Sequence, residues 1–199
     1  CSDLTGGLVA QTKLDILTPT IEKPTSNGPA HIGMDHFPRA DDELAVAQRN
    51  KTLQRNFQGY STRGGADIYA FGMSSISQTE NAYWQNLKEL QPYYQALDQG
   101  QLPVTRGYRL TPEDRIRRTI IMRLMCDLGL DYEAMSKLLG LDFKAHFAPE
   151  LKSLNDMEAD GLLVRTPHGV VVTDLGRLLI RNIAMRFDAR LARMPAYYR

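Results

Sequence analysis

The residue types most able to do chemistry lie between positions 31 and 77. This stretch carries polar side chains, aromatic rings and glycines where a simple core would carry leucine and valine. Histidine and aspartate stand in its first residues, and an Asn-Phe-Gln-Gly-Tyr run follows at 56–60. Glutamine can both donate to and accept from a polar ligand, and an apolar ring beside it can exclude water. The stretch is therefore more typical of a binding or active site than of a core.

Metal binding is a weaker possibility in the same stretch. His31 and His36 flank Asp35, and imidazole and carboxylate groups can hold a metal ion. A structural hydrogen bond between such groups is more frequent, so no metal site is predicted. The two cysteines, Cys1 and Cys126, lie far apart, and the chain has no C-x-x-C or C-x-x-x-C-x-x-C spacing. Cys126 lies among apolar residues and is expected to be a buried, unreactive thiol.

A basic region lies near the C-terminus. A solvated helix face is the favoured interpretation, and recognition of carboxylates or phosphates by guanidinium groups is the alternative. Nucleic acid is not expected as a partner, because the net charge is only +1 and the candidate recognition helix at 143–160 is acidic overall. The basic residues concerned are Arg177, Arg181, Arg186, Arg190 and Arg193.

The composition is that of an ordinary folded protein. Of the 199 residues, 43% are apolar and 24% are charged, which argues against wholesale disorder. No apolar run approaches the ~20 residues that span a bilayer, so no transmembrane helix and no membrane partner are expected. The scarcity of cysteine suits the cytoplasm. The chain begins with Cys1, and a start inside a longer chain is favoured over a lipid-bearing N-terminus.

The elements of the first half must position the candidate residues. Helical spacing at 13–23 is interrupted by Pro19, so a kinked or broken helix is expected there. Asp41 or Asp42 can cap a helix that follows Pro38. The other expected elements are a strand at 30–34, a loop at 54–66, a strand at 68–76, a helix at 82–97 and a linker at 100–107.

The second half has the pattern of a small helical module. Thr111 followed by Pro112 and two acidic residues is typical of a helix start, and Gly129 is typical of a helix end. The order of helices, hairpin and final helix predicts a winged-helix-like domain. The further elements are helices at 132–139 and 143–160, a hairpin joining 161–164 to 170–172, and a last helix from Asp174.

Several motifs together resemble the oxygen-independent coproporphyrinogen III oxidases, which are radical S-adenosylmethionine enzymes of haem biosynthesis. The resemblance covers roughly residues 11–190. The motifs are GMDHF, DDELAVAQ, RNFQGYST, the Ser75-Ile76-Ser77 run, TPEDRIRR, the Leu130-Asp131-Tyr132 turn and GRLLIRNIAMRFD.

This resemblance implies an α/β fold, with residues 1–105 as the C-terminal remnant of a partial TIM-like barrel and 106–199 as a mostly α, winged-helix-like domain. It implies oxidative decarboxylation of two propionates of coproporphyrinogen III to vinyl groups. The implied cofactors are S-adenosylmethionine and a [4Fe-4S] cluster, and the implied enzyme is a cytoplasmic monomer that takes electrons from a donor such as flavodoxin. The cluster-binding cysteines precede the matched region, so the chain alone is expected to be inactive.

The resemblance also assigns roles to three residues. Phe57 and Gln58 match the functional Phe-Gln pair of the family and are the expected catalytic residues. Ile76 matches an isoleucine that contacts bound S-adenosylmethionine, and is the expected cofactor-binding residue. Core packing is the alternative role for all three. For the whole chain, the alternatives are a non-catalytic tetrapyrrole-binding or accessory module and a winged-helix DNA-binding module.

Overall fold

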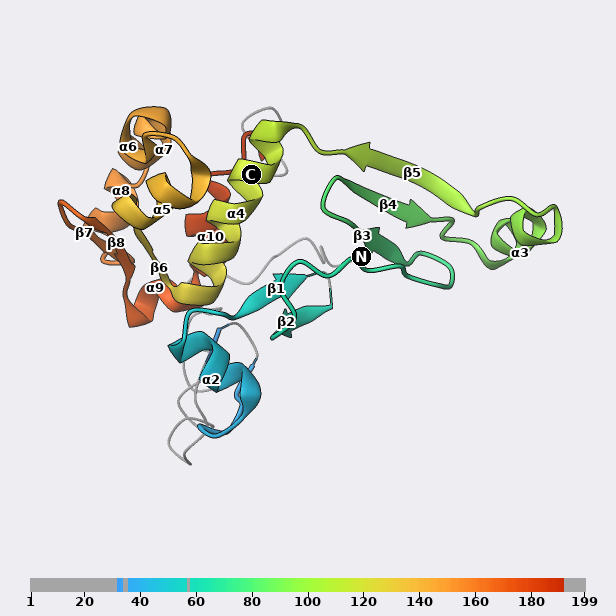
Figure 1. The fold of residues 1–199 in the computed structure, drawn as a ribbon, viewed down its shortest axis with the longest axis horizontal. Helices are drawn as coiled ribbons and strands as arrows, with labels where there is room; N and C mark the ends of the chain where they lie inside the picture. The colour runs from blue at the N-terminus through green and yellow to red at the C-terminus, as the bar shows by residue number, and fades with distance from the viewer. Residues whose placement is uncertain (1–31, 34–35, 57, 192–199) are drawn as a thin grey trace, which may run out of the picture.

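The computed structural model describes residues 32–33, 36–56 and 58–191. This part forms a helical body, a hairpin below it and a long arm that projects to one side (Figure 1). The helices are α2 (Glu43–Arg49), α3 (Leu90–Asp98), α4 (Pro112–Asp127), α5 (Tyr132–Leu139), α6 (Phe143–His146), α7 (Ala148–Lys152), α8 (Asn155–Ala159), α9 (Asp174–Leu178) and α10 (Ile180–Met185). The strands are β1 (Gln54–Asn56), β2 (Gly59–Ser61), β3 (Ile76–Gln78), β4 (Ala82–Asn86), β5 (Val104–Arg109), β6 (Gly129–Asp131), β7 (Leu163–Arg165) and β8 (Gly169–Val172).

Helix α4 is the element on which the other parts meet. Its predicted start is confirmed: the Thr111 hydroxyl accepts a hydrogen bond from the Asp114 backbone N–H, and the Asp114 carboxylate accepts one from the Thr111 N–H. The helix ends at Leu128, whose φ of +56° is left-handed. Gly129 then begins strand β6, where a side chain would collide with the Val170 carbonyl. The glycine is thus required by sheet packing rather than by the helix end.

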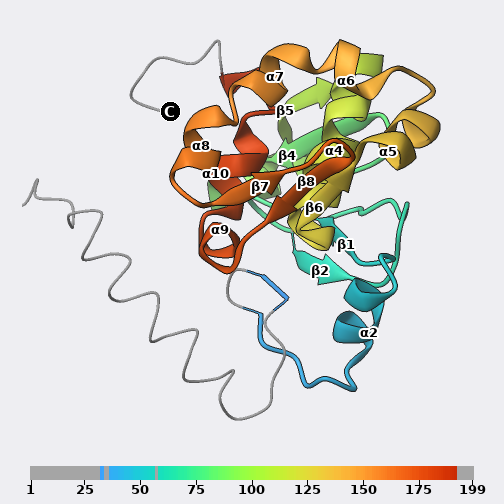
Figure 2. The ribbon, with the colours of Figure 1, turned by 90° about the vertical axis from the view of Figure 1, so that its left-hand side faces the viewer.

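The helical body includes the three-stranded antiparallel sheet β6-β8-β7, which lies at its outer side (Figure 2). The predicted helix at Tyr132–Leu139 and the predicted hairpin are confirmed. The expectation of one helix at 143–160 is wrong, because the segment forms α6, α7 and α8. Pro149, in the first turn of α7, lacks the N–H that a continuous helix would use. The last helix is likewise divided, into α9 and α10. The buried core includes Phe143, Phe147, Leu124, Ile183 and Phe187.

Helix α2 and the following hairpin pack against the C-terminal end of α4. The predicted cap of α2 is confirmed, since the Asp42 carboxylate accepts a hydrogen bond of 2.8 Å from the Leu44 N–H. The Gln48 side chain donates to the carbonyls of Ile32 and Cys126 at 2.8 and 3.0 Å. Residues 54–66 were expected to be a loop, but β1 and β2 pair there as a short hairpin. These contacts fix the hairpin beside α4.

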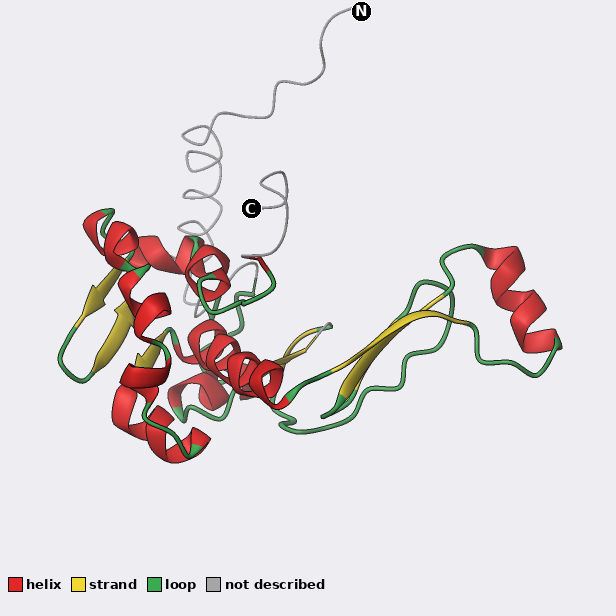
Figure 3. Ribbon diagram, turned by 90° about the horizontal axis from the view of Figure 1, so that it is seen from above, coloured by secondary structure: helices red, strands yellow, loops and turns green. Residues whose placement is uncertain are grey.

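The arm consists of the antiparallel sheet β3-β4-β5, with α3 at its far end (Figure 3). The expected helix at 82–97 is wrong: its first residues form β4, and a helix begins only at Leu90. Aromatic residues such as Tyr83 and Trp84 favour strands, and β4 gains hydrogen-bonded neighbours on both edges. The expected linker at 100–107 contributes most of β5. The expected strand at 68–76 is reduced to a bridge at Ile68 and the start of β3.

The fold is mixed α/β, with small sheets and no closed barrel within the described residues. Every strand pair there is antiparallel, whereas the strands of a TIM-like barrel are parallel. The predicted division between residues 105 and 106 lies within β5, and it stays a prediction. The expected helix at 13–23 and most of the expected strand at 30–34 lie outside the described residues. In the described part of the chain, none of the helices has the length and apolar character needed to cross a membrane.

Candidate functional site

A cleft of about 980 Å³ lies where the hairpin, the base of the arm and α4 meet. Its walls combine apolar side chains, two tyrosines and six arginines. The lining residues include Arg55, Asn56 and Arg63 from the hairpin region, Gln78, Thr79, Glu80, Tyr83 and Tyr108 from the arm, Leu110, Asp114, Arg117, Arg118, Ile121, Met122 and Arg123 from α4 and the residue before its cap, and Asp188 and Arg190 from the C-terminal segment.

Of the sequence-predicted residues, Gln58 and Ile76 do not line this cleft. Gln58 is exposed in the hairpin turn, where its backbone N–H donates to the Asn56 side chain at 2.8 Å. Ile76 begins β3 and is half-buried, opposite Gln85 of β4. Asn56 and Gln78, each two positions from a predicted residue, do line the cleft. Phe57 lies outside the described residues. The roles predicted for all three residues stay predictions.

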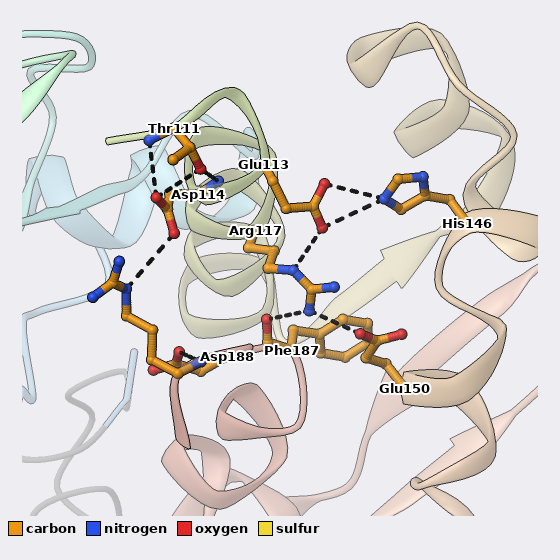
Figure 4. Close-up of polar contacts among 9 residues, drawn as sticks. Thr111, Glu113, Asp114, Arg117, His146, Glu150, Phe187 and Asp188 are labelled. Atoms are coloured by element: carbon orange, nitrogen blue, oxygen red, sulfur yellow. Dashed lines mark hydrogen bonds and ion pairs between the residues drawn. The ribbon is translucent and has the colours of Figure 1, made fainter. Parts of the chain in front are cut away.

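Arg117 connects α4 to the rest of the helical body (Figure 4). Its guanidinium lies 2.7 Å from Glu113 and 2.8 Å from Glu150, and donates to the Phe187 carbonyl at 3.0 Å. Burial acts to lower the pKa of Arg117, but the hydrogen bonds and charges of both carboxylates outweigh burial and raise the pKa. His146 also contacts Glu113, at 3.2 Å. Arg117 is therefore a neutralised structural cation, although it lines the cleft.

Asp114 forms a second polar cluster at the rim of the cleft. It accepts hydrogen bonds from Thr111 and from the Tyr108 hydroxyl, the latter at 2.6 Å, and lies 3.7 Å from Arg190. Burial acts to raise the pKa of Asp114, but these hydrogen bonds and the Arg190 charge lower it to about 2. Arg190 also stacks on the Tyr108 ring, with its guanidinium carbon 3.7 Å from the ring centre. This cluster ties the C-terminal segment to the base of the arm.

The C-terminal arginines behave differently from one another. Arg181 and Arg186 are exposed, in agreement with a solvated face. Arg177 instead lies 3.5 Å from Asp174, and Arg190 lines the cleft. Arg193 lies outside the described residues. Sequence reasoning missed Arg190 as a cleft residue because its position depends on how the segment after α10 folds back.

The arginines of the hairpin and of α4 were also missed as cleft residues. Arg55 is the first residue of the motif RNFQGYST, and Arg118 is the last residue of TPEDRIRR. Arg123 follows the second motif closely. They line one cleft because the hairpin lies against α4. Arg123 shows this packing, since it donates to the carbonyls of Lys51 and Leu53. The density of arginines within α4 was the signal available in the sequence.

The expectations about metal and thiol chemistry can be examined within the described residues. No group of three or more His, Cys, Asp or Glu side chains comes together there in a way that could hold a metal ion. His36 packs edge-on against Tyr60, while His31 and Asp35 lie outside the described part. Cys126 is fully buried, and burial raises the pKa of its thiol to about 12. Cys126 is thus the inert thiol that the sequence predicts.

Comparison with known proteins gives consistent matches. Residues 110–179 match the HemN C-terminal domain. The chain is 49% identical over 193 residues to an oxygen-independent coproporphyrinogen III oxidase of Salmonella typhimurium, covering 96% of this chain and 42% of that protein. It is 50% identical over 181 residues to a protein of the same name from Thermostichus vulcanus, covering 90% of this chain and 56% of that one.

A solved structure of a similarly named protein also matches the chain. It is described as "Coproporphyrinogen III oxidase (HemN) from Escherichia coli is a Radical SAM enzyme", and it superposes with a TM-score of 0.85 at 48% sequence identity. The likeness covers 92% of this chain and 42% of that one. The chain therefore spans about half or less of the length of these relatives.

Proposed function

This chain is related to the oxygen-independent coproporphyrinogen III oxidases, and on that premise we propose that it supplies the C-terminal part of such an enzyme. The proposed reaction is oxidative decarboxylation of two propionates of coproporphyrinogen III to vinyl groups, in haem biosynthesis. The observation that carries the proposal is that the likeness extends over nearly the whole chain. It includes the hairpin and the arm as well as the C-terminal domain.

The proposed cofactors are those of the radical S-adenosylmethionine enzymes. When bound, these cofactors would supply the radical chemistry that oxidative decarboxylation of the propionates requires. The sequence has two cysteines, Cys1 and Cys126, and no C-x-x-x-C-x-x-C spacing, so in this proposal the cluster ligands belong to the part of the enzyme that the chain does not match. What this chain would offer is a wall of the site: Gln58 as a hydrogen-bonding residue, Phe57 as an apolar one, and Ile76 as a contact to S-adenosylmethionine.

The finer structural expectations belong to the same proposal. The order α4, β6, α5, the short helices and the hairpin β7-β8 supports a winged-helix-like C-terminal domain. We propose that, in the complete enzyme, the arm packs against the portion that corresponds to the unmatched part of the relatives. Large apolar side chains on it are exposed, including Phe71 at 91% and Leu102 at 85%. Exposed apolar groups gathered on one element are typical of a surface that another part of a protein covers.

The remaining expectations concern the complete enzyme. We propose that it is a cytoplasmic monomer, and that a donor such as flavodoxin reduces its cluster. Both expectations rest on the relationship to the family alone.

Anaerobic reconstitution with iron and sulfide tests whether the cluster is bound outside this chain. The 199-residue chain alone should show no [4Fe-4S] absorption. A chimera in which this chain replaces the matching segment of the Escherichia coli relative should bind as much iron as the parent enzyme. A stable [4Fe-4S] cluster in the chain alone would overturn the proposal, and so would a folded chimera that loads no cluster.

A further inference from the structure

The cleft carries an excess of positive charge. Six arginines line it, against three carboxylates, Glu80, Asp114 and Asp188. Some of these arginines are neutralised. Arg117 contacts Glu113 and Glu150, Arg123 contacts Asp127, and Arg190 contacts Asp114.

The other three cleft arginines have no carboxylate within ion-pair distance among the residues that the structure describes. They are Arg55, Arg63 and Arg118, from the hairpin, the segment after it, and α4. The Nε of Arg55 is buried and has no hydrogen-bond partner in the described part of the chain. The guanidinium carbon of Arg55 lies 5.7 Å from the centre of the Tyr60 ring, a contact that leaves its positive charge uncancelled. An anion bound in the cleft at the other nitrogens of this guanidinium would therefore be favourable.

Arg118 is held in place by neutral groups. Its Nη1 donates to the Thr79 carbonyl at 3.0 Å and to the Tyr83 hydroxyl at 3.2 Å. A guanidinium has five N–H donors in a fixed fork, so further donors remain for a ligand. Because neutral partners orient the group without cancelling its charge, Arg118 is preorganised for an anion rather than satisfied by one.

The rest of the cleft offers aromatic and apolar surface for a large ligand. Tyr83 and Tyr108 give aromatic surface, and Leu110, Ile121 and Met122 give apolar surface. A volume of about 980 Å³ is at the upper end of the usual range for small-molecule sites. The arginines come from separate segments of the chain, so the cleft can offer more than one site for the carboxylates of a single ligand.

We propose that this cleft binds the propionate carboxylates of the tetrapyrrole substrate, with Arg55, Arg63 and Arg118 as the binding residues. The inference rests on the proposed function, because only that function names a tetrapyrrole. It adds to the predicted residues Gln58 and Ile76 the guanidinium groups that would hold the substrate. A carboxylate is also present in S-adenosylmethionine, so the test must separate these two sources.

The test is a titration of the whole chain with coproporphyrin III, the coloured and stable oxidised form of the substrate, followed by absorbance and by Trp84 fluorescence. Arg55→Gln combined with Arg63→Gln should weaken binding about tenfold or more, since each variant removes a charge-assisted hydrogen bond. Arg55→Lys, which keeps the charge, should lose less. Arg181→Gln removes an exposed arginine outside the cleft and should bind like the unmodified chain.

Two further titrations decide the ligand class. The tetramethyl ester of coproporphyrin III lacks free carboxylates and should bind the unmodified chain no better than it binds the double variant. S-adenosylmethionine should bind both forms equally. The inference is overturned if the chain does not bind coproporphyrin III, if the double variant binds it equally well, or if the variants affect only S-adenosylmethionine. In each of these cases a catalytically active chimera would leave the proposed function standing.

Discussion

The Nη1 atom of Arg117 lies 2.8 Å from Oε1 of Glu150, and this ion pair joins α4 to α7. Both side chains are largely buried, with exposed fractions of 15% and 16%. The same guanidinium holds Glu113 and the Phe187 carbonyl, so one side chain connects three segments of the helical body. The cleft-lining face of α4 is thereby held in a fixed position relative to the C-terminal segment.

Replacing Arg117 should therefore destabilise the body. Arg117→Met should lower the free energy of unfolding by about 2–3 kcal/mol, because Glu150 would be left largely buried without its partner. Urea denaturation followed by circular dichroism measures this change. Lys137→Met is the control, since the Lys137–Glu133 pair is exposed and its loss should leave stability unchanged. Equal effects of the two variants would contradict the structural role of Arg117.

Asp114 should make stability depend on pH in the acidic range. Its pKa is lowered in the folded protein, to about 2 from an ordinary value of 3.8, so the folded state favours the charged form. This contribution is present above pH 4 and is lost as the pH falls from about 4 towards 2. The stability of Asp114→Asn relative to the unmodified chain should therefore improve over that window. A difference that stays constant from pH 5 to pH 2 would exclude this linkage.

How much the sequence could predict differs between the two halves. The start of α4, helix α5 and the β7-β8 hairpin follow from local signals, such as the Thr111 cap and the apolar runs on either side of a Thr-Pro-His-Gly turn. The arm does not, because its strands depend on pairing between positions about 20 residues apart, such as Trp84 with Gly107. The spacing of Tyr83, Leu87, Leu90 and Tyr94 imitates a helix, and tertiary pairing overrides it.

The candidate site was likewise predictable only in part. The motif RNFQGYST predicts site residues in the segment that forms the β1-β2 hairpin, and residues of that hairpin line the cleft. The charged walls could not be predicted, because the cleft arginines come from segments far apart in the sequence that meet only after folding. Arg190 was assigned to a solvated face, yet it stacks on Tyr108 and lines the cleft.

The exposed apolar residues of the arm should promote self-association of the isolated chain. Phe71→Ser combined with Leu102→Ser should raise the protein concentration at which association begins, because both side chains are almost fully exposed. The unfolding free energy should not change, since neither residue belongs to a buried core cluster in the described part of the chain. Sedimentation velocity over a concentration series measures the effect. If the double variant associates at the same concentration as the unmodified chain, the surface that drives association does not include Phe71 and Leu102.

Gln58 should affect cofactor binding without affecting folding. In the chimera with the Escherichia coli relative, Gln58→Ala should weaken the binding of S-adenosylmethionine about tenfold, the loss expected for a hydrogen bond to a charged ligand. Its exposed position in the hairpin turn predicts an unchanged melting temperature and cluster content. Gln99→Ala, at the end of α3, is the matched control and should bind the cofactor normally. Normal binding by Gln58→Ala would remove Gln58 from the site.

The most direct measurement is turnover of coproporphyrinogen III by that chimera, reconstituted with its cluster and supplied with S-adenosylmethionine and a chemical reductant. If this chain supplies the C-terminal part of a coproporphyrinogen III oxidase, the chimera should form the divinyl product, and the Escherichia coli segment without this chain should not. A chimera that is folded and loaded with its cluster, yet forms no vinyl product, would contradict that claim.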